Sequence, residues 1–357
     1  IEQAKKDGKQ VVIVDQDGEV VAAEGADAAV PAKPGEGVWA NYDFVPGNRI
    51  LFAEDFSQDR VGDFPKRLEF VKGNWEIVEW EGQRLLRNTG PRYAAVKIVL
   101  PRELPESFTI ELDAHFTHGN HRMIVATTAP EPGKYWNSLE GNFFQIGVAH
   151  GTGVTTRAKG GVESTNRSPE VETGLVPIRI MVDGRYAKVY VRERRVANIP
   201  NAEFRRSAEI YIENIYSGSA ENPLYLGPIR IAEGGRNLYD KLAEDGRVAT
   251  QGILFAVNSS KIRPESTPTL EEIGTMLQEH EDLRIRIEGH TDASGDDASN
   301  QTLSEERAGV VRRFLIDTYG IDESRLESQG FGESSPVDTN DTPEGQQNNR
   351  RVELIKL

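Results

Sequence analysis

The pattern of hydrophobic and polar positions changes once along the chain, near residue 234. Before this point, short stretches in which apolar and polar residues alternate are separated by Gly, Pro and Asn, which predicts strands rather than helices. Many short strands at such spacing favour a two-sheet β-sandwich over residues 38–233. The expected strands include residues 75–80, 108–113, 143–148, 178–182, 187–191 and 210–212.

Beyond residue 249 the pattern mixes helices with strands. Residues 264–280 carry apolar side chains at Leu270, Ile273 and Leu277, a spacing that predicts a helix, and a second helix is expected from about Ser304 to Tyr319. Strands are expected at 252–255, 283–288 and 351–355. Strands joined through helices predict an α/β or α+β domain over residues 250–357, with helices packed on a mixed sheet.

Two connecting segments complete this multidomain organisation. Residues 1–37 begin with an alternating stretch at 10–14, a possible edge hairpin, and continue as a tail or linker rich in Ala, Gly and Pro. Residues 234–249 begin with two glycines and are expected to form a hinge. A length of 357 residues suits two domains, because single cores stop growing near ~250 to 300 residues.

Composition and charge exclude several functional classes. The net charge is −15, which makes nucleic acid a poor partner because phosphate binding needs a basic face. The chain has no cysteine, so disulfides and thiolate metal sites are excluded. No run of 18 apolar residues occurs, so no transmembrane helix is expected. Because the sequence starts at Ile1, we expect a processed or truncated form from which an export signal or anchor has been removed.

Five blocks in the last third of the chain resemble the OmpA C-terminal-like family in order and spacing. They are FAVNSSKIRP at 255–264, IEGHTD at 287–292, NQTLSEERA at 300–308, RLESQGFGE at 325–333 and NRRV at 349–352. The resemblance covers about 105 residues. It implies a domain that binds peptidoglycan without cofactor or catalysis, in a periplasmic protein associated with the cell wall and the outer membrane.

The resemblance also implies a ligand, the diaminopimelate of the peptide stems, and a site. Diaminopimelate ends in a carbon that bears an ammonium and a carboxylate, so a receptor needs an anion and a cation a few ångströms apart. Asp292, at the end of a strand, would take the ammonium, and Arg307, in the first turn of the next helix, would bind the carboxylate bidentately. Backbone amides at the start of that helix would add donors.

By resemblance the site extends to four further residues, with Leu303 as a wall and Arg350 as a supporting cation. The other two are Thr291 and Asn300. Two positions depart from the family pattern. Ala256 stands where many members carry an acidic residue, and Gly-Gln-Gln at 345–347 replaces the usual Gly-Arg-Ala.

Neighbouring residues also have simpler interpretations. Asp292 and Arg307 alone would suggest an ordinary surface ion pair, which contributes ~0 to 1 kcal/mol. His290 is interpreted as a structural hydrogen-bonding residue, because no nucleophile accompanies it.

The predicted sandwich resembles laminin-G-like and concanavalin-like jelly rolls in the pattern of residues 182–198 and 225–231. One strand resembles the catalytic strand of laminarinase-type glycoside hydrolases, with Glu111, Asp113 and His115 on one face. In that family the acid/base follows at the position that is Phe116 here, so a hydrolase of this type would lack its proton donor. We therefore expect no enzymatic activity.

A non-catalytic binding module for carbohydrate or protein is the other hypothesis for the sandwich. Its candidate stacking residues, for which packing in the core is the simpler interpretation, are Trp75, Trp80, Tyr135, Trp136, Phe143 and Phe144. Asp55, Asp59 and Asp63 suggest a calcium site, although solvated turn acids are the simpler interpretation, and we expect no metal.

The sequence thus predicts non-covalent anchoring to peptidoglycan, with the sandwich contacting an outer-membrane protein or a polysaccharide. The alternative is a wall-associated module that binds or hydrolyses polysaccharide.

Overall fold

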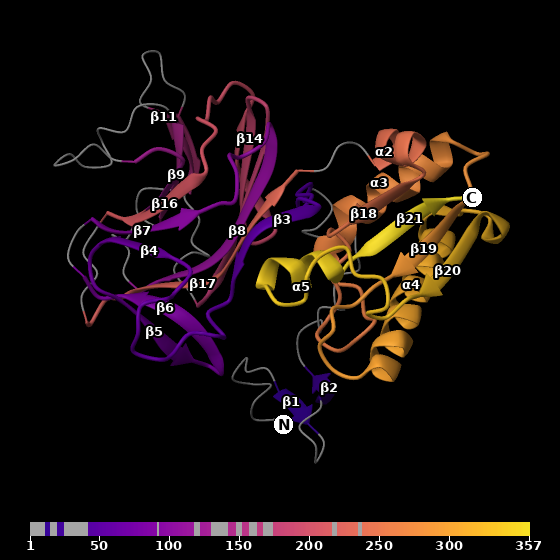
Figure 1. Cartoon of the computed structure of the whole chain (residues 1–357), viewed down its shortest axis with the longest axis horizontal. Helices are drawn as coiled ribbons and strands as arrows, with labels where there is room; N and C mark the ends of the chain where they lie inside the picture. The colour runs from indigo at the N-terminus through magenta and orange to yellow at the C-terminus, as the bar shows by residue number, and fades with distance from the viewer. Residues whose placement is uncertain are drawn as a thin grey trace.

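A computed structural model shows a β-sandwich beside a smaller C-terminal domain of helices on a mixed sheet (Figure 1). The structure describes residues 11–14, 20–24, 42–90, 93–117, 122–129, 142–147, 152–156, 163–166, 174–215, 220–234 and 238–357. The predicted N-terminal hairpin is present: β1 (Val11–Val14) pairs antiparallel with β2 (Val20–Glu24). The two strands form a sheet of their own.

Two antiparallel sheets form the sandwich. The first has the order β12-β11-β10-β9-β16-β7-β4, and the second has the order β15-β14-β13-β8-β17-β6-β5, with β3 also paired to β17. The strands of the first sheet are β4 (Glu69–Lys72), β7 (Ala94–Val99), β9 (Arg122–Ala126), β10 (Asn142–Gly147), β11 (Thr152–Thr156), β12 (Glu163–Asn166) and β16 (Glu209–Asn214). Those of the second are β3 (Arg49–Glu54), β5 (Trp75–Trp80), β6 (Gln83–Asn88), β8 (Ser107–Phe116), β13 (Val176–Asp183), β14 (Tyr186–Val191), β15 (Arg194–Ile199) and β17 (Leu224–Glu233).

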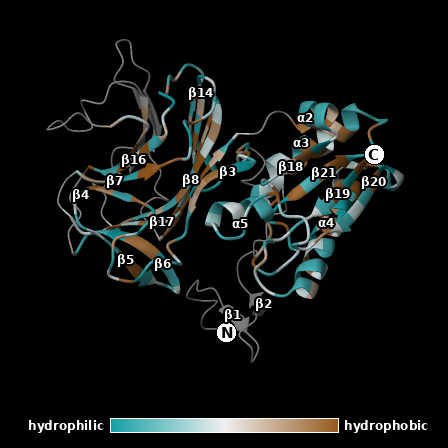
Figure 2. Ribbon diagram, viewed as in Figure 1, coloured by the Kyte–Doolittle hydropathy of each residue, from teal (hydrophilic) through white to brown (hydrophobic). Residues whose placement is uncertain are grey.

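Strand β8 shows how the alternating pattern builds the core. Phe108, Ile110 and Leu112 are buried in the cluster between the two sheets. Glu111 and Asp113 alternate with them and so point to the opposite face of their sheet. Figure 2 shows hydrophobic segments along the strands of both domains, whereas the helices are mostly hydrophilic.

The C-terminal domain is a four-stranded sheet of order β18-β21-β19-β20, in which β19 and β20 are parallel and the other pairs antiparallel. Its strands are β18 (Arg247–Thr250), β19 (Ile285–Gly289), β20 (Leu326–Gly330) and β21 (Val352–Lys356). Its helices are α2 (Leu238–Asp245), α3 (Thr267–Glu279), α4 (Asp297–Tyr319) and α5 (Pro343–Asn349), with short 3-10 turns at Pro264–Ser266 and Glu323–Arg325. Buried Leu270, Val311 and Leu315 join the helices to the sheet core.

Three local predictions differ from the structure. Most of the hinge predicted at 234–249 is part of the C-terminal domain, because α2 and β18 belong to its core through Leu242 and Val248. The strand expected at 252–255 is reduced to a single bridge between Phe255 and Ile262. Helix α4 begins at Asp297, seven residues before the predicted start, because Asp296 caps it by accepting a hydrogen bond from the backbone of Ser299 (3.0 Å).

The two domains meet where β3 lies along α5 (Figure 1). Asn348 accepts a hydrogen bond from the backbone N–H of Ile50 (2.9 Å), and Glu344 accepts one from that of Ala53 (2.7 Å). Arg67 of the sandwich also pairs with Glu344. Side chains of α5 thus satisfy backbone donors along β3, which would otherwise attract another strand.

A buried carboxyl in the sandwich predicts a pH effect. Burial raises the pKa of Glu213 from its ordinary 4.5 to about 7, with Lys72 opposing. Between these values the folded state binds more protons than the unfolded state, so stability falls as pH rises. We expect Glu213→Gln to match the wild type at pH 4 and to exceed its unfolding free energy by about 3 kcal/mol at pH 8.

Urea unfolding followed by tryptophan fluorescence measures this effect, because all four tryptophans precede residue 140. A difference between the two proteins that does not change with pH would contradict the prediction.

Candidate functional site

Close packing of α4 on the sheet positions the predicted site. Gly289 and Gly330 are register partners on β19 and β20. A Cβ at Gly289 would lie 2.3 Å from the carbonyl oxygen of Ser304, and one at Gly330 would lie 2.3 Å from the backbone nitrogen of Glu305. Only glycines permit this approach, which brings α4 beside the segment that follows β19.

Asp292 lies three residues beyond the end of β19 and is 5% exposed. Its Oδ1 accepts a hydrogen bond from the backbone of Ser294 (3.0 Å), and its Oδ2 pairs with Nη1 of Arg350. The cation on Asp292 is therefore Arg350, the predicted supporting residue, rather than Arg307. The neighbouring Thr291 has a buried hydroxyl that makes no hydrogen bond within the described residues.

Arg307 is half-buried and forms a hydrogen bond with the loop that precedes α3. Its Nε donates to the carbonyl oxygen of Ser259 (3.0 Å), and its guanidinium lies 4.9 Å from the ring centroid of Phe255. Burial and the nearby Arg350 lower its pKa, although Asp292 acts in the opposite direction. Among the described residues, no carboxylate forms an ion pair with Arg307.

The early start of α4 changes the expected donors around Arg307. Arg307 is the eleventh residue of the helix, so it lies in the third turn rather than the first. At ~1.5 Å per residue, the helix start is about 15 Å away. The backbone amides expected to assist Arg307 are therefore at the other end of the site.

Asn300 and Leu303 lie on the same side of α4, nearer its start. The Asn300 amide donates to the Glu333 carboxylate (2.6 Å) and to the backbone oxygens of Ser294 (3.1 Å) and Asp292 (3.3 Å). It thereby fixes the loop that carries Asp292. Leu303 is half-buried and, with Asn300, lines a surface hollow. Sequence reasoning missed Glu333, although the block at 325–333 contains it.

His290 does not fit its interpretation as a hydrogen-bonding residue. Both ring nitrogens are buried and have no hydrogen-bond partner among the described residues, while the ring stacks on Phe331 at 5.3 Å. Burial, together with nearby Arg351, lowers its pKa to about 4, so the ring is neutral near pH 7. Sequence reasoning had no signal for this packing role.

His290, Glu288 and Glu353 are grouped closely enough for a metal ion, with ligand atoms within 4.8 Å of one another. However, Glu288 pairs with Arg286 (2.8 Å) and Glu353 pairs with Arg351 (2.5 Å). Because both carboxylates are already matched to guanidinium groups, the arrangement favours an ion-pair network over a cation site.

The two acidic residues of the hydrolase-like strand are held in ion pairs. Glu111 pairs with Arg230 and, at 3.4 Å, with Arg179, which also contacts Asp113 at 3.1 Å. The His115 ring lies beside those of Trp80 (5.3 Å) and Tyr225 (5.8 Å), which are themselves 5.7 Å apart. Phe116 is buried, at the position where the resemblance would place a proton donor.

Among the other sandwich candidates, Trp75, Phe143 and Phe144 are core residues. Trp80 is half-buried, and Tyr135 and Trp136 lie outside the described residues. The three aspartates suggested for calcium serve the loops instead. Asp55 accepts from Ser57 N (2.9 Å), Asp59 accepts from Lys66 N (3.1 Å), and the backbone oxygen of Asp63 accepts from Ile77 N (2.9 Å).

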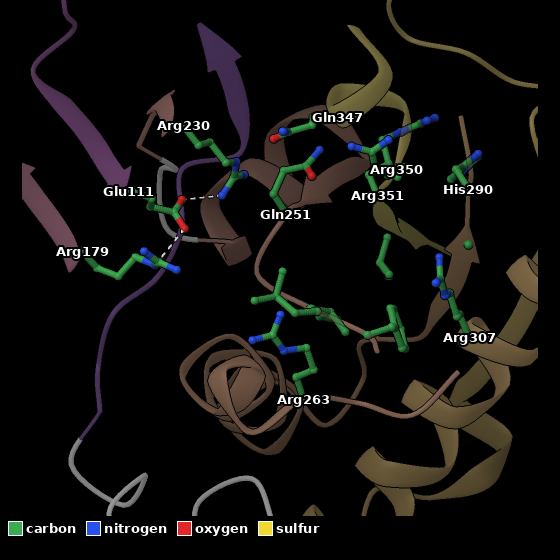
Figure 3. Close-up of a pocket in the computed structure, with 15 residues that line it drawn as sticks. Glu111, Arg179, Arg230, Gln251, Arg263, His290, Arg307, Gln347, Arg350 and Arg351 are labelled. Carbon is green, nitrogen blue, oxygen red and sulfur yellow. Dashed lines mark hydrogen bonds and ion pairs between the residues drawn. The ribbon is translucent and has the colours of Figure 1, made fainter. Parts of the chain in front are cut away.

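A cavity of about 340 Å³ opens beside Arg307 and Arg350 and reaches the sandwich. Figure 3 shows Arg307 and His290 at one end of it and Glu111, Arg179 and Arg230 at the other. The cavity that Arg307 lines is therefore formed by residues of both domains. Within the described part of the chain, no helix has the length and apolar character needed to cross a membrane.

Comparison with known proteins concerns the C-terminal domain. The model of the OmpA family matches residues 254–350. The chain is similar to the outer-membrane lipoprotein YfiB of Pseudomonas aeruginosa, at 37% identity over 125 residues, 35% of this chain and 73% of that protein. It is also similar to outer membrane porin F of the same species, at 40% identity over 101 residues, 28% of this chain and 29% of the porin.

Omp38 of Acinetobacter baumannii is similar over 28% of its own length, so the chain spans less than a third of either of these two outer-membrane proteins. Among solved structures, the cell wall anchor of the T6SS from Pseudomonas aeruginosa matches at 30% identity, with a TM-score of 0.29, over 34% of this chain and 94% of that one.

Proposed function

The chain belongs to the OmpA family through its C-terminal domain, and on that premise we propose that this domain holds the chain on peptidoglycan without covalent chemistry. The proposed ligand is the diaminopimelate of a stem peptide, with its carboxylate on Arg307 and its ammonium on Asp292. The proposal contains no catalytic step.

The state of Arg307 carries the proposal. Its guanidinium is partly buried beside a second cation, Arg350, without a carboxylate partner among the described residues. The lowered pKa of Arg307 means that its surroundings disfavour the charge. An incoming carboxylate would supply the missing anion and accept two parallel hydrogen bonds from the planar guanidinium.

The rest of the site fits the other half of the ligand. Asp292 is held by Ser294 and Arg350, and a carboxylate has acceptor positions for a further ammonium donor. The Arg350 side chain is 45% exposed, so it has room to share Asp292 with the ligand.

For the whole chain we propose a periplasmic location, at the cell wall and near the outer membrane. Its relatives include an outer-membrane lipoprotein and outer-membrane porins. The sandwich, which we propose to be a concanavalin-like jelly roll, would contact an outer-membrane protein or a polysaccharide. In this arrangement one domain holds the wall and the other reaches a second component of the envelope.

Calorimetric titration of the full chain with a stem peptide tests the proposal. A peptide containing diaminopimelate is expected to bind at least tenfold more tightly than the analogue containing lysine, which lacks the side-chain carboxylate. Equal affinities for the two peptides would exclude recognition of that carboxylate. Release of reducing sugar from insoluble peptidoglycan would instead support the hydrolytic alternative.

A further inference from the structure

The cavity beside Arg307 is lined by residues of both domains, so the sandwich forms part of it. Glu111 on β8, Arg179 on β13 and Arg230 on β17 line its far end, on the outward face of the sandwich sheet (Figure 3). Its volume of about 340 Å³ falls within the range of sites that bind small ligands.

The lining of the cavity is strongly cationic in a chain whose net charge is −15. Among the described residues, six arginines and a single carboxylate, Glu111, line it. The arginines are Arg179, Arg230, Arg263, Arg307, Arg350 and Arg351. Because like charges repel at such short range, a cluster of this kind favours an anionic occupant.

Ion pairs hold Arg179, Arg230 and Arg263 in place. Glu111 lies between Arg179 and Arg230, so one carboxylate serves two guanidinium groups. Arg230 also donates to the carbonyl oxygen of Gly47 (3.1 Å), and Arg263 pairs with Glu265. A guanidinium has five N–H donors, so Arg230 and Arg263 keep donors for another acceptor.

Contacts between the domains fix the two ends of the cavity relative to each other. The backbone of β3 donates to Asn348 and Glu344 of α5, and α5 ends next to Arg350. Strand β3 in turn pairs with β17, which carries Arg230. The arginines of the sandwich and those of the C-terminal domain are thus joined through a continuous set of backbone and side-chain hydrogen bonds.

We propose that this cavity binds a second carboxylate of the same stem peptide, the free C-terminal carboxylate beyond diaminopimelate, on Arg230 and Arg263. This inference rests on the proposed function, because it takes the diaminopimelate carboxylate to be on Arg307. The sandwich then contributes directly to recognition of the wall, and the full chain selects peptides with a free carboxyl end.

The test compares two diaminopimelate-containing stem peptides in calorimetric titrations of the full chain, one with a free C-terminal carboxylate and one with a C-terminal carboxamide. The wild type is expected to bind the free acid about tenfold more tightly than the carboxamide. This is the difference expected when one charge-assisted hydrogen-bonded contact is missing. Arg230→Gln and Arg263→Gln are each expected to reduce this preference to about threefold or less, chiefly by weakening binding of the free acid.

Matched controls separate the possible results. Arg185→Gln removes a sandwich arginine that is 65% exposed and pairs with Glu203, and it should keep the full preference. The Arg263 variant guards against a folding defect in the Arg230 variant, because the Arg263 side chain is 51% exposed. Tryptophan fluorescence checks the sandwich in each variant.

Equal binding of both peptides by the wild type would overturn this inference while leaving the proposed function in place. An undiminished preference in both the Arg230 and Arg263 variants would also overturn it. Failure of the wild type to bind either peptide would overturn the proposed function and this inference together.

Discussion

The substitution Arg307→Ala is expected to weaken binding of the diaminopimelate peptide by the full chain more than 100-fold, or about 3 kcal/mol. The alanine removes the cation that lacks a carboxylate partner in the described structure. Arg307→Lys should restore only part of the affinity, because an ammonium offers a point charge without the planar pair of donors and stacks less well on Phe255. Titration calorimetry of the three proteins measures the series.

The stability of the Arg307→Ala variant provides a second readout. Burial and Arg350 disfavour the charge on Arg307. We therefore expect the free energy of unfolding of the variant to equal or exceed that of the wild type. Arg313→Ala is the matched control, because this arginine is exposed on another side of the same helix. Binding by Arg307→Ala at wild-type affinity would show that the ligand carboxylate is held elsewhere.

The substitution Gly289→Ala is expected to destabilise the C-terminal domain by about 3 kcal/mol. The new Cβ would lie 2.3 Å from the backbone oxygen of Ser304, so α4 must move away from β19. This displacement would move Asn300 and Arg307 relative to Asp292. We therefore expect at least a tenfold loss of affinity for the peptide in addition to the loss of stability.

Gly309→Ala is the matched control for this second effect. Gly309 lies on the same helix, and a Cβ there would meet no atom within 4 Å, so alanine should stabilise α4 by about 0.5–1 kcal/mol. Urea unfolding followed by far-ultraviolet circular dichroism at 222 nm reports on the C-terminal domain, which holds the α-helices of the described residues. A Gly289→Ala protein as stable as Gly309→Ala would contradict the close-packing argument.

The contact between β3 and α5 links the sandwich to the segment that carries Arg350. Arg350 follows α5 directly, and its partner is Asp292. A displacement of β3 would therefore move α5, and with it Arg350 at the proposed ammonium site.

Local sequence patterns determined the domain classes. Alternation along β8 and β13 predicted strands because burying one face of a sheet needs a period of two. The stripe that contains Leu270 and Leu277 predicted α3, because that spacing places apolar side chains on one face. The order of the family blocks along the chain was enough to name the residues of the candidate site.

Local patterns failed where polar side chains or distant strands decide the structure. The first turns of α4 are mostly polar and lack an apolar stripe, so only the cap at Asp296 marks their start. Residues 234–249 looked like a hinge because two glycines are followed by a short polar stretch. Within them, α2 and β18 are ordered by packing that includes the distant strand β21.

The sequence alone determined the family of the C-terminal domain, the β-rich character of the segment before it, and the six candidate residues. Only the tertiary structure decided that Asp292 pairs with Arg350, that Arg307 stacks on Phe255, and that the sandwich arginines complete the cavity. The physical reason is that ion pairs and cavities depend on distances between residues far apart in the chain. A one-dimensional pattern of polarity carries no information about those distances.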